Sequence, residues 1–202
     1  MLTTLRRQTA TGLRLLLVMT VLCGIVYPLA IWGVSRLPGL STQAEGSVLP
    51  GGTGSSLIGI DPVAADPAAD PYFHTRPSST STAEAGLGPA DTTTSGGSNK
   101  GGFDTGLLES VQQRRAVIAA REGVDPAAVP TDAVTASGSG LDPDISPAYA
   151  ALQAPRVARV TGLPLSRVQE LVADATSGRT LGFLGEPRVD VTELNLSVRD
   201  AR

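Results

Sequence analysis

The longest apolar run in the chain extends from Leu15 to Val34 and contains no formally charged residue. A helix of that length spans about 30 Å, which matches the hydrocarbon thickness of a bilayer. Arginines are biased toward its N-terminal side, since Arg6, Arg7 and Arg14 precede it and only Arg36 follows closely. The positive-inside rule then places the N-terminus in the cytoplasm. We therefore expect a short cytoplasmic N-terminus at 1–12, a single-pass transmembrane helix at 13–36 and an extracytoplasmic remainder.

A cleaved signal peptide shares the basic start and the apolar run. The run is longer than a usual signal-peptide core and lacks an Ala-x-Ala site, which favours a retained helix. Trp32 suits an interfacial anchor, and Pro28 frees a backbone carbonyl for a partner helix or water. Gly24 and Gly33 are compatible with helix packing, although a plain lipid anchor explains the run equally well.

The pattern beyond residue 36 predicts short elements separated by irregular chain. Residues 37–56 indicate a linker, Leu57–Ile60 a short strand, and Tyr72–Ser78 a segment of β character that ends at Pro77. Residues 78–102 are mostly Ser, Thr, Gly, Ala and Pro, which is typical of a flexible loop or of a functional one. We expect a folded domain only from residue 57 onward, at 57–202.

Helical periodicity follows this loop. Asp104 can cap a helix whose apolar positions share one stripe, Asp125–Val129 suggests one further turn, and Pro164–Thr176 predicts another helix that ends near Gly178. Apolar alternation returns from Val189 to Val198 with a change of phase, which favours a strand with a β-bulge near Thr192.

A stretch rich in small residues occupies the middle of the domain. Val134 begins a β-branched run, the turn Ser137–Gly140 follows, and Ser146 with Pro147 indicates a helix start. Pro155 should kink or split that helix. Together these elements predict an α+β fold in a single small domain.

Composition excludes several classes of function. A net charge of −3 and a pI near 5.1 leave no basic face for nucleic acid. The one cysteine, Cys23, lies in the apolar run, and the one histidine, His74, has no ligand-spaced partners, so we expect no metal site. Neither Ser137 nor Ser139 sits in a Gly-x-Ser-x-Gly elbow, and the chain lacks a phosphate-binding Gly-x-x-x-x-Gly-Lys loop and an Asp-Lys-Thr-Gly phosphorylation sequence. We therefore expect no catalytic residues.

Several segments in order carry a resemblance to a known family. They are Tyr72-Phe73, Arg76-Pro-Ser78, Ser95-Gly96-Gly97-Ser98-Asn99, Val134 to Pro143 with Ser137-Gly138-Ser139-Gly140 and Asp142, Gln153, Arg156-Val-Ala158, and Gly182-Phe-Leu-Gly-Glu-Pro187. In this order they resemble the C subunit of the Kdp potassium-transporting P-type ATPase. The chain departs from the family pattern at Lys100-Gly-Gly, where the family commonly has Leu-Gly-Pro. It departs again at Asp190, where the family usually has Asn.

The resemblance implies an accessory subunit for high-affinity potassium uptake. Its partners would be a potassium-binding channel-like subunit, an ATP-hydrolysing subunit and membrane lipid, with no nucleic acid. The family also implies that the chain raises ATP affinity through Gln153 and Arg156, with no tightly bound cofactor and ATP met only in a ternary complex. An extracytoplasmic domain could not reach cytoplasmic ATP, so Gln153 has a second interpretation, as a donor or acceptor for backbone freed near Pro155.

The other motif residues are then candidates for subunit contact, namely Arg76, Ser95 to Asn99, Ser137 to Gly140 and Asp142. Two further classes of function stay open at this point. One is a membrane-anchored extracytoplasmic binding module unrelated to transport. The other is a secreted hydrolase, which requires cleavage after the apolar run.

Overall fold

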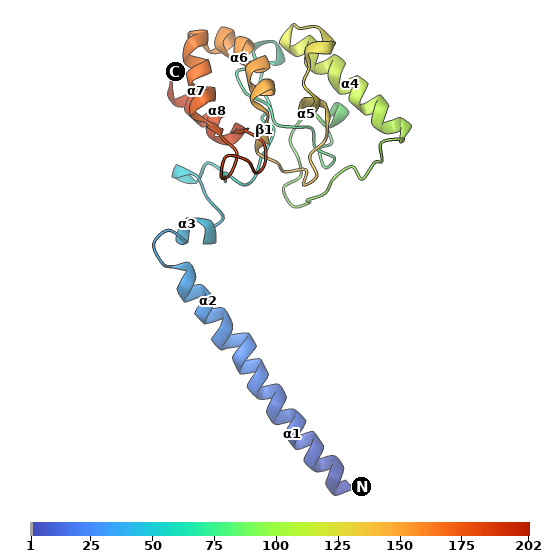
Figure 1. Ribbon diagram of the computed structural model, residues 1–202, viewed down its shortest axis with the longest axis vertical. Helices are drawn as coiled ribbons and strands as arrows, with labels where there is room; N and C mark the ends of the chain where they lie inside the picture. The colour runs from blue at the N-terminus through green and yellow to red at the C-terminus, as the bar shows by residue number, and fades with distance from the viewer. Residues whose placement is uncertain (1) are drawn as a thin grey trace. The chain divides into compact units, whose positions relative to one another are not determined.

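The computed structural model describes residues 2–202 (Figure 1). The chain divides into two compact units, residues 1–47 and 48–202. The second unit begins at Val48, within the range that the sequence predicts as a linker. It opens with an antiparallel bridge between Val48 and Ser55 around a 3₁₀ turn at Pro50–Gly52.

The first unit is a long helix followed by a short one. α1 (Leu2–Val21), a π-helical turn (Leu22–Val26) and α2 (Tyr27–Ser35) form a continuous helix of 34 residues, and α3 covers Ser41–Ala44. The prediction of one long apolar helix is confirmed, and its length and hydropathy suffice to cross a membrane. It begins at Leu2, well before residue 13.

Pro28 explains the π-helical turn. A proline ring clashes with the carbonyl four residues earlier, here that of Gly24, and offers it no N–H. The backbone widens over Leu22–Val26, so that the Tyr27 N–H bonds to the Leu22 carbonyl five residues earlier. The helix therefore continues through the proline.

The second unit combines helices with a small sheet. Its helices are α4 (Thr105–Glu122), α5 (Thr131–Val134), α6 (Pro147–Thr161), α7 (Leu165–Asp174) and α8 (Val191–Asp200), with 3₁₀ turns at Pro67–Ala69, Glu84–Gly86 and Pro126–Ala128. The strands β1 (Asp144–Ile145), β2 (Thr176–Ser177) and β3 (Arg188–Asp190) form an antiparallel sheet in the order β1-β3-β2. The α+β prediction is confirmed.

Local capping defines the two longest helices of this unit. The Asp104 carboxylate accepts a hydrogen bond from the Leu107 N–H, and the Ser146 hydroxyl accepts one from the Tyr149 N–H, as the sequence predicts. Gly123 and Gly162 end α4 and α6 in the left-handed conformation. The capping residues that flank each helix therefore determine where it begins and where it ends.

The hydrophobic core lies between α4, α6, α7, α8 and β3. Its fully buried side chains include Phe73, Ile118, Tyr149, Val157, Val168, Val189 and Leu194. Aromatic residues make up only 3% of the chain, so the core depends on aliphatic packing around one phenylalanine and one tyrosine. This hydrophobic core is therefore small in relation to the length of the second unit.

Several sequence predictions are wrong. Val189–Val198 is a short strand followed by α8, because Asp190 caps a helix and Val191, Leu194 and Val198 follow the helical period. Val134 ends the helix α5 instead of starting a strand, and α6 is not split at Pro155, which lies on its exposed face.

The remaining differences concern element ends and isolated segments. α7 ends at Asp174 and β2 follows, so Gly178 does not end a helix. Leu57–Ile60 and Tyr72–Ser78 belong to no strand. The second of these segments obtains its hydrogen bonds from side chains, as described below.

Asp190 provides a prediction on pH. Burial raises its pKa to about 6, against the hydrogen bond that its carboxylate accepts from the Glu193 N–H, and Glu193 and Asp144 add like charge. A folded pKa above the unfolded value of 3.8 means that the contribution of Asp190 to stability falls as pH rises from about 4 to about 6. Asp190→Asn keeps a good N-cap and removes this loss. Allowing for partial exposure, we expect a gain of about 1 kcal/mol at pH 8 and none at pH 3.

The measurement is unfolding of the full chain in detergent at both pH values, followed by circular dichroism. Glu109→Gln, at an exposed position within α4, is the control and should change stability at neither pH. A gain for Asp190→Asn that is equal at pH 3 and pH 8 would contradict the assignment.

Candidate functional site

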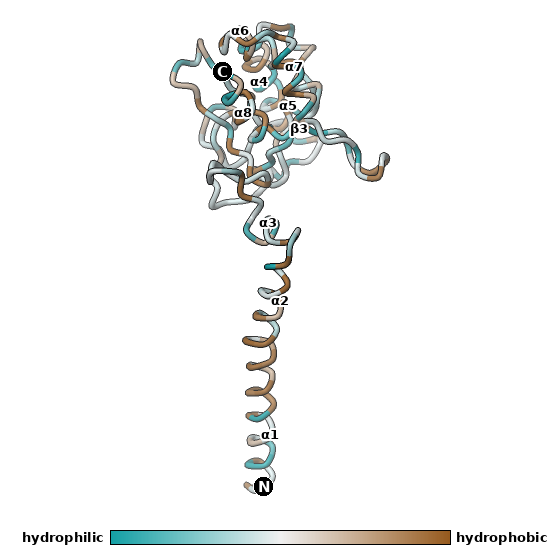
Figure 2. The backbone as a smooth tube through the Cα atoms, turned by 90° about the vertical axis from the view of Figure 1, so that its left-hand side faces the viewer, coloured by the Kyte–Doolittle hydropathy of each residue, from teal (hydrophilic) through white to brown (hydrophobic). Residues whose placement is uncertain are grey.

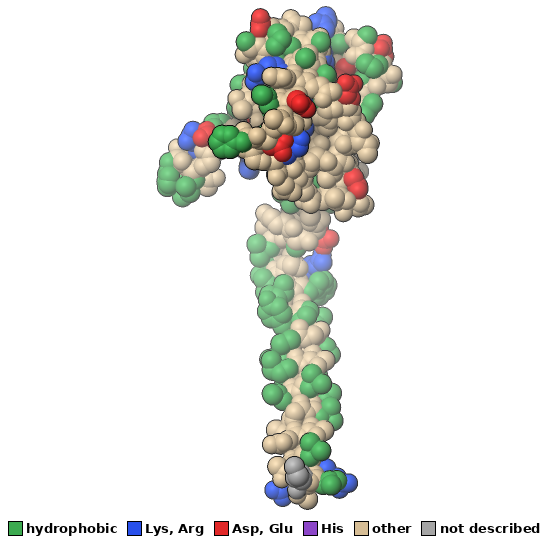
Figure 3. Space-filling model, turned by 90° about the vertical axis from the view of Figure 1, so that its right-hand side faces the viewer, with side chains coloured by type: hydrophobic (Ala, Val, Ile, Leu, Met, Phe, Trp, Pro, Cys, Tyr) green, Lys and Arg blue, Asp and Glu red, His purple; other side chains and the backbone are tan. Residues whose placement is uncertain are grey.

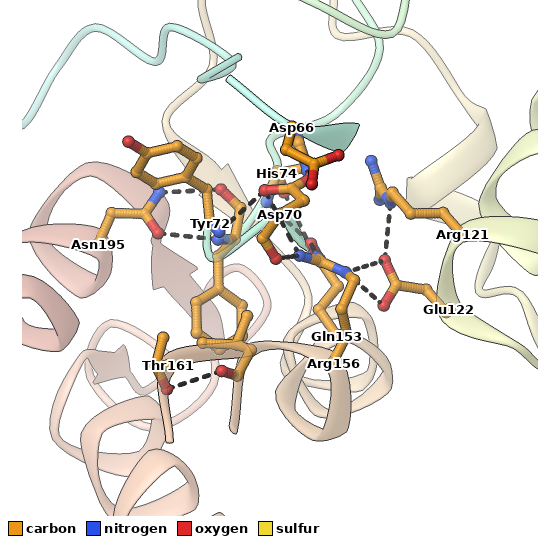
Figure 4. Close-up of polar contacts among 12 residues, drawn as sticks. Asp66, Asp70, Tyr72, His74, Arg121, Glu122, Gln153, Arg156, Thr161 and Asn195 are labelled. Carbon is orange, nitrogen blue, oxygen red and sulfur yellow. Dashed lines mark hydrogen bonds and ion pairs between the residues drawn. The ribbon is translucent and has the colours of Figure 1, made fainter. Parts of the chain in front are cut away.

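The centre of the second unit is the segment around Phe73 and His74, whose backbone is paired by side chains (Figure 4). The Phe73 N–H donates to the Asn195 Oδ1 at 2.8 Å, and the Asn195 Nδ2 donates to the Phe73 carbonyl at 2.8 Å. The His74 N–H donates to the Gln153 Oε1 at 2.8 Å, and the Gln153 Nε2 donates to the His74 carbonyl at 3.2 Å. Two amide side chains, from α8 and α6, thus take the place of neighbouring strands.

The His74 side chain joins two carboxylates. Its Nδ1 lies 2.9 Å from the Asp61 Oδ1, and its Nε2 lies 2.5 Å from the Asp70 Oδ2, with all three side chains buried. Each ring nitrogen thus lies within hydrogen-bonding distance of a carboxylate oxygen. The Thr75 N–H also donates to the Asp61 Oδ1, at 3.1 Å. The His74 ring therefore connects its own segment to Asp61 and Asp70, which both precede it in the chain.

Arg156 extends this arrangement toward α4. Its Nη1 donates to the Asp70 carbonyl at 2.7 Å, its Nη2 to the Gln153 Oε1 at 3.2 Å, and its Nε to the Glu122 Oε2 at 3.0 Å. Glu122 also accepts from the Arg121 Nε at 2.7 Å, and the Arg121 Nη2 donates to the Tyr149 hydroxyl at 2.9 Å. We call the set of Asp61, Asp70, His74, Arg121, Glu122, Gln153 and Arg156 the buried polar network.

Acidic and basic side chains are paired within the network. The carboxylates of Asp61 and Asp70 face the His74 ring, and the carboxylate of Glu122 faces the guanidinium groups of Arg121 and Arg156. Burial alone would raise the pKa of Asp70, but the hydrogen bond and charge of His74 hold it below its usual value. Burial raises the pKa of Tyr149 to about 12, although the Arg121 charge opposes this. Tyr149 therefore stays protonated at neutral pH.

The two residues that the family resemblance assigns to nucleotide contact belong to this network. Gln153 is 0% exposed and Arg156 is 4% exposed. Their polar atoms bond to His74, Asp70, Glu122 and each other. The alternative interpretation, in which Gln153 bonds backbone freed near Pro155, is wrong, because Gln153 points inward and Pro155 lies on the exposed face. The nucleotide assignment stays a prediction.

The glycine and serine motifs form a second cluster, which we call the glycine–serine cluster. It brings Pro77–Ser79, Ser95–Asn99 and Ser137–Gly140 together. The Gly96 N–H donates to the Ser139 carbonyl at 2.8 Å, and the Ser137 N–H donates to the Pro77 carbonyl at 3.0 Å. Hydroxyls reinforce these contacts, since Ser95 Oγ donates to the Ser139 carbonyl and Ser79 Oγ to the Gly96 carbonyl.

Gly140 cannot be replaced without moving this cluster. Its φ is +73°, and a Cβ there would lie 2.9 Å from the Gly96 carbonyl oxygen and 3.1 Å from the Ser78 Oγ. Its N–H donates to the Ser137 Oγ at 2.7 Å, and the Leu141 N–H donates to the Ser139 Oγ at 3.1 Å. The turn is closed by its own serines, which leaves their hydroxyls engaged.

Arg76 and Asp142 lie beside the cluster. The Arg76 Nη1 donates to the Asp142 Oδ2 at 3.0 Å, and its Nη2 donates to the carbonyls of Thr135 and Ala136 at 3.3 and 3.4 Å. The structure thus brings Arg76 and Asp142 together with most of the Ser95–Asn99 and Ser137–Gly140 motifs. Ser98 and Asn99 lie exposed at the edge, with Asn99 at a φ of +53°.

Sequence reasoning missed the partners Asp61, Asp70, Glu122 and Asn195. No local signal marks them, because a carboxylate beside proline or on a helix is usually exposed. Among residues 2–202, no group of three or more His, Cys, Asp or Glu side chains is arranged to hold a metal ion.

A groove of about 410 Å³ lies beside α8, lined mostly by apolar residues. The lining includes Ile58, Ile60, Tyr72, Asn195 and Leu196, and only Asn195 of these bonds the central segment. Its chemistry suits packing and not proton or group transfer.

Comparison with known proteins adds a family assignment. The family model described as "K+-transporting ATPase, c chain" matches residues 9–200. A relative from Kineococcus radiotolerans, named potassium-transporting ATPase KdpC subunit, is 49% identical over 200 residues, which cover 99% of this chain and 97% of the relative. Relatives of the same name from Streptomyces coelicolor and Mycobacterium tuberculosis are 44% and 45% identical, over 98% and 96% of this chain and 94% and 98% of their own lengths.

Replacement of Gln153 should destabilise the second unit. Gln153→Leu leaves the buried His74 N–H and carbonyl without partners, and each unpaired group costs about 1–3 kcal/mol. We expect the free energy of unfolding to fall by about 3 kcal/mol, measured by denaturant unfolding of the full chain in detergent. Gln169→Leu, on the exposed face of α7, is the matched control. Stability within about 0.5 kcal/mol of the parent for Gln153→Leu would show that the pairing is unimportant.

Two glycine substitutions test the glycine–serine cluster. Gly140→Ala forces a left-handed alanine against the Gly96 carbonyl, and we expect a loss of about 2 kcal/mol. Gly138→Ala, where a Cβ meets nothing within 4 Å, should leave stability unchanged or slightly raised. Hydrogen exchange at residues 95–99 should accelerate only in Gly140→Ala. Equal exchange in the two variants would disprove the close contact.

Proposed function

The chain belongs to the family of the c chain of K⁺-transporting ATPases, and we propose that it is the accessory, membrane-anchored subunit of a high-affinity potassium uptake complex. The observation that carries this proposal is the family match over residues 9–200, which includes the apolar run at 15–34 and all but the last two residues of the second unit. Its partners in this proposal are a potassium-binding channel-like subunit and an ATP-hydrolysing subunit. The chain itself is a non-catalytic subunit of the complex.

The second unit supports an assembly role. The side chains of its buried polar network bond to one another, and its serine hydroxyls at 137 and 139 close a turn. The network connects the segment around His74 to α4 and α6, and the glycine–serine cluster holds its three chain segments together. A rigid unit of this kind suits a surface that docks on larger subunits and stabilises them.

The arginine distribution supports an orientation. Arg6, Arg7 and Arg14 lie on one side of the apolar run, so the N-terminus is cytoplasmic and residues 48–202 are extracytoplasmic in this proposal. There the second unit would lie on the side from which potassium enters the complex.

Any influence on ATP affinity is then indirect. In this orientation the second unit and cytoplasmic ATP are on opposite sides of the membrane. Direct contact through Gln153 and Arg156 would also require both residues to leave their buried partners. We propose that the chain affects ATP use only in the assembled complex, by stabilising the ion-binding subunit in a conformation that the hydrolysing subunit senses.

Right-side-out sealed vesicles allow one test of both assembly and orientation. The full chain, tagged at its N-terminus, is purified in mild detergent from vesicles treated or not treated with external protease. Without protease, we expect the chain to co-purify with a multi-pass membrane protein and a protein carrying the Asp-Lys-Thr-Gly sequence. With protease, we expect loss of residues 48–202 and retention of the tagged helix.

Co-purification tests the assembly role, and protease accessibility tests the orientation. Recovery of the chain alone from untreated vesicles would overturn the assembly role. Protection of residues 48–202 in intact vesicles, with digestion only after the vesicles are opened, would overturn the orientation and restore direct ATP contact.

A further inference from the structure

The segment between β2 and β3 forms a projecting arm, residues 178–187, that the buried polar network and the glycine–serine cluster do not use. Every residue of the arm is exposed. It extends away from the rest of the unit next to β3 in Figure 2, and its outer end is coloured hydrophobic. Figure 3 shows hydrophobic side chains at the end of the same projection, with charged side chains behind them.

The arm carries a cluster of apolar side chains in solvent. Leu181 is 80% exposed, Phe183 is 68% exposed and Leu184 is 50% exposed. Single exposed apolar residues are ordinary, but three at the end of one projection are typical of a binding surface. Phenylalanine and leucine at such a position are large enough to fill a pocket on a partner.

The backbone holds these side chains outward. Thr180 and Leu184 exchange two hydrogen bonds of 2.9 Å, and the Gly182 N–H donates to the Arg179 carbonyl at 3.0 Å. Leu181, Gly182 and Gly185 have φ values of +54°, +82° and +78°, and leucine rarely adopts this conformation. A tip that is already ordered loses little conformational entropy on binding.

The charges near the tip favour a protein partner over a lipid surface. The Arg179 Nη2 pairs with the Glu186 Oε2 at 2.6 Å, and the Arg188 Nε lies 3.3 Å from the Asp144 Oδ2. Both arginines therefore have carboxylate partners within the unit, so the arm carries no excess positive charge that would attract anionic headgroups. The arm also has no Trp or Tyr, the residues that favour the membrane interface.

We propose that the arm is the anchor by which the second unit docks on the multi-pass, potassium-binding channel-like subunit of the pump, with Leu181, Phe183 and Leu184 inserted into an apolar pocket on that subunit's extracytoplasmic surface. The inference rests on the proposed function, since it names the contact that the accessory subunit uses. Arg179 and Glu186, which pair with each other behind the tip, then lie at the polar rim of the interface.

Phe183 and Phe103 provide a matched pair for the test. Both are exposed phenylalanines of the second unit, and Phe103, at 105% exposure, lies in the loop before α4. Each is replaced in turn by p-benzoyl-phenylalanine in the full chain, and the assembled complex is irradiated in native membranes. We expect a covalent adduct to a multi-pass subunit from position 183, at a yield at least ten times that from position 103.

Other adducts would overturn the proposal. These are an adduct at position 183 to lipid only, to a second copy of this chain only, or at a yield no higher than from position 103. Irradiation is carried out on chains that co-purify with the multi-pass subunit. Failure of co-purification would overturn the proposed function, whereas co-purification without the adduct would overturn the arm alone.

Serine variants measure the energetic importance of the tip. Phe183→Ser should increase the rate of dissociation from the complex at least tenfold, because large apolar anchors at the centre of an interface carry much of the affinity. Phe103→Ser should change that rate less than twofold. Both variants should keep the unfolding midpoint of the parent chain, since neither side chain is in the core. Equal dissociation rates in the two variants would overturn the anchor.

Discussion

The segment from Asp70 to Ser78 passes through the second unit without a neighbouring strand, so side chains have to satisfy its buried backbone. Asn195 pairs with both backbone groups of Phe73, and Gln153 pairs with both of His74. Each such group would cost about 1–3 kcal/mol if it were left unpaired. This requirement fixes α6 and α8 on either side of the segment, and the rest of the unit is arranged around them.

The charged groups give this arrangement a unique register. Replacing a buried ion pair with apolar residues is often neutral or stabilising, so the network is weak grounds for stability alone. An aliphatic contact, however, tolerates sliding of one segment past another. The contacts of His74 with Asp61 and Asp70, and of Arg156 with Glu122, are satisfied in one alignment only. In a chain with 3% aromatic content, Phe73 and Tyr149 are the aromatic side chains among the buried hydrophobic residues, so few side chains could set that alignment by shape.

Structural features that depend on residues close together in the chain could be predicted from the sequence alone. The caps Asp104 and Ser146, the long apolar helix and the α+β class follow from patterns within a few residues. Asp190 was missed as a cap because Val189 and Val191 alternate like a strand over that short window. The central site depends on partners far apart in the chain, since the Phe73 and Asn195 contact spans 122 positions and the His74 and Gln153 contact spans 79. The glycine motifs were recognised by resemblance, but only the structure shows why Gly140 is needed.

A continuous set of contacts connects the buried polar groups to the projecting arm. Arg76 binds Asp142, and the Asp142 Oδ1 accepts a hydrogen bond from the N–H of Asp144 in β1. β1 pairs with β3, and β3 leads from the arm directly into α8, where Asn195 holds Phe73. The arm is therefore attached to a sheet that is connected to the pair of Arg76 and Asp142 through β1 and to Asn195 through α8. Loosening either connection would widen the range of directions that the tip samples, and a docking tip binds more weakly when its orientation has to be fixed during binding. Tight binding by the arm therefore requires both a rigid interior, which fixes the direction of the arm, and an exposed apolar tip, which contacts the partner.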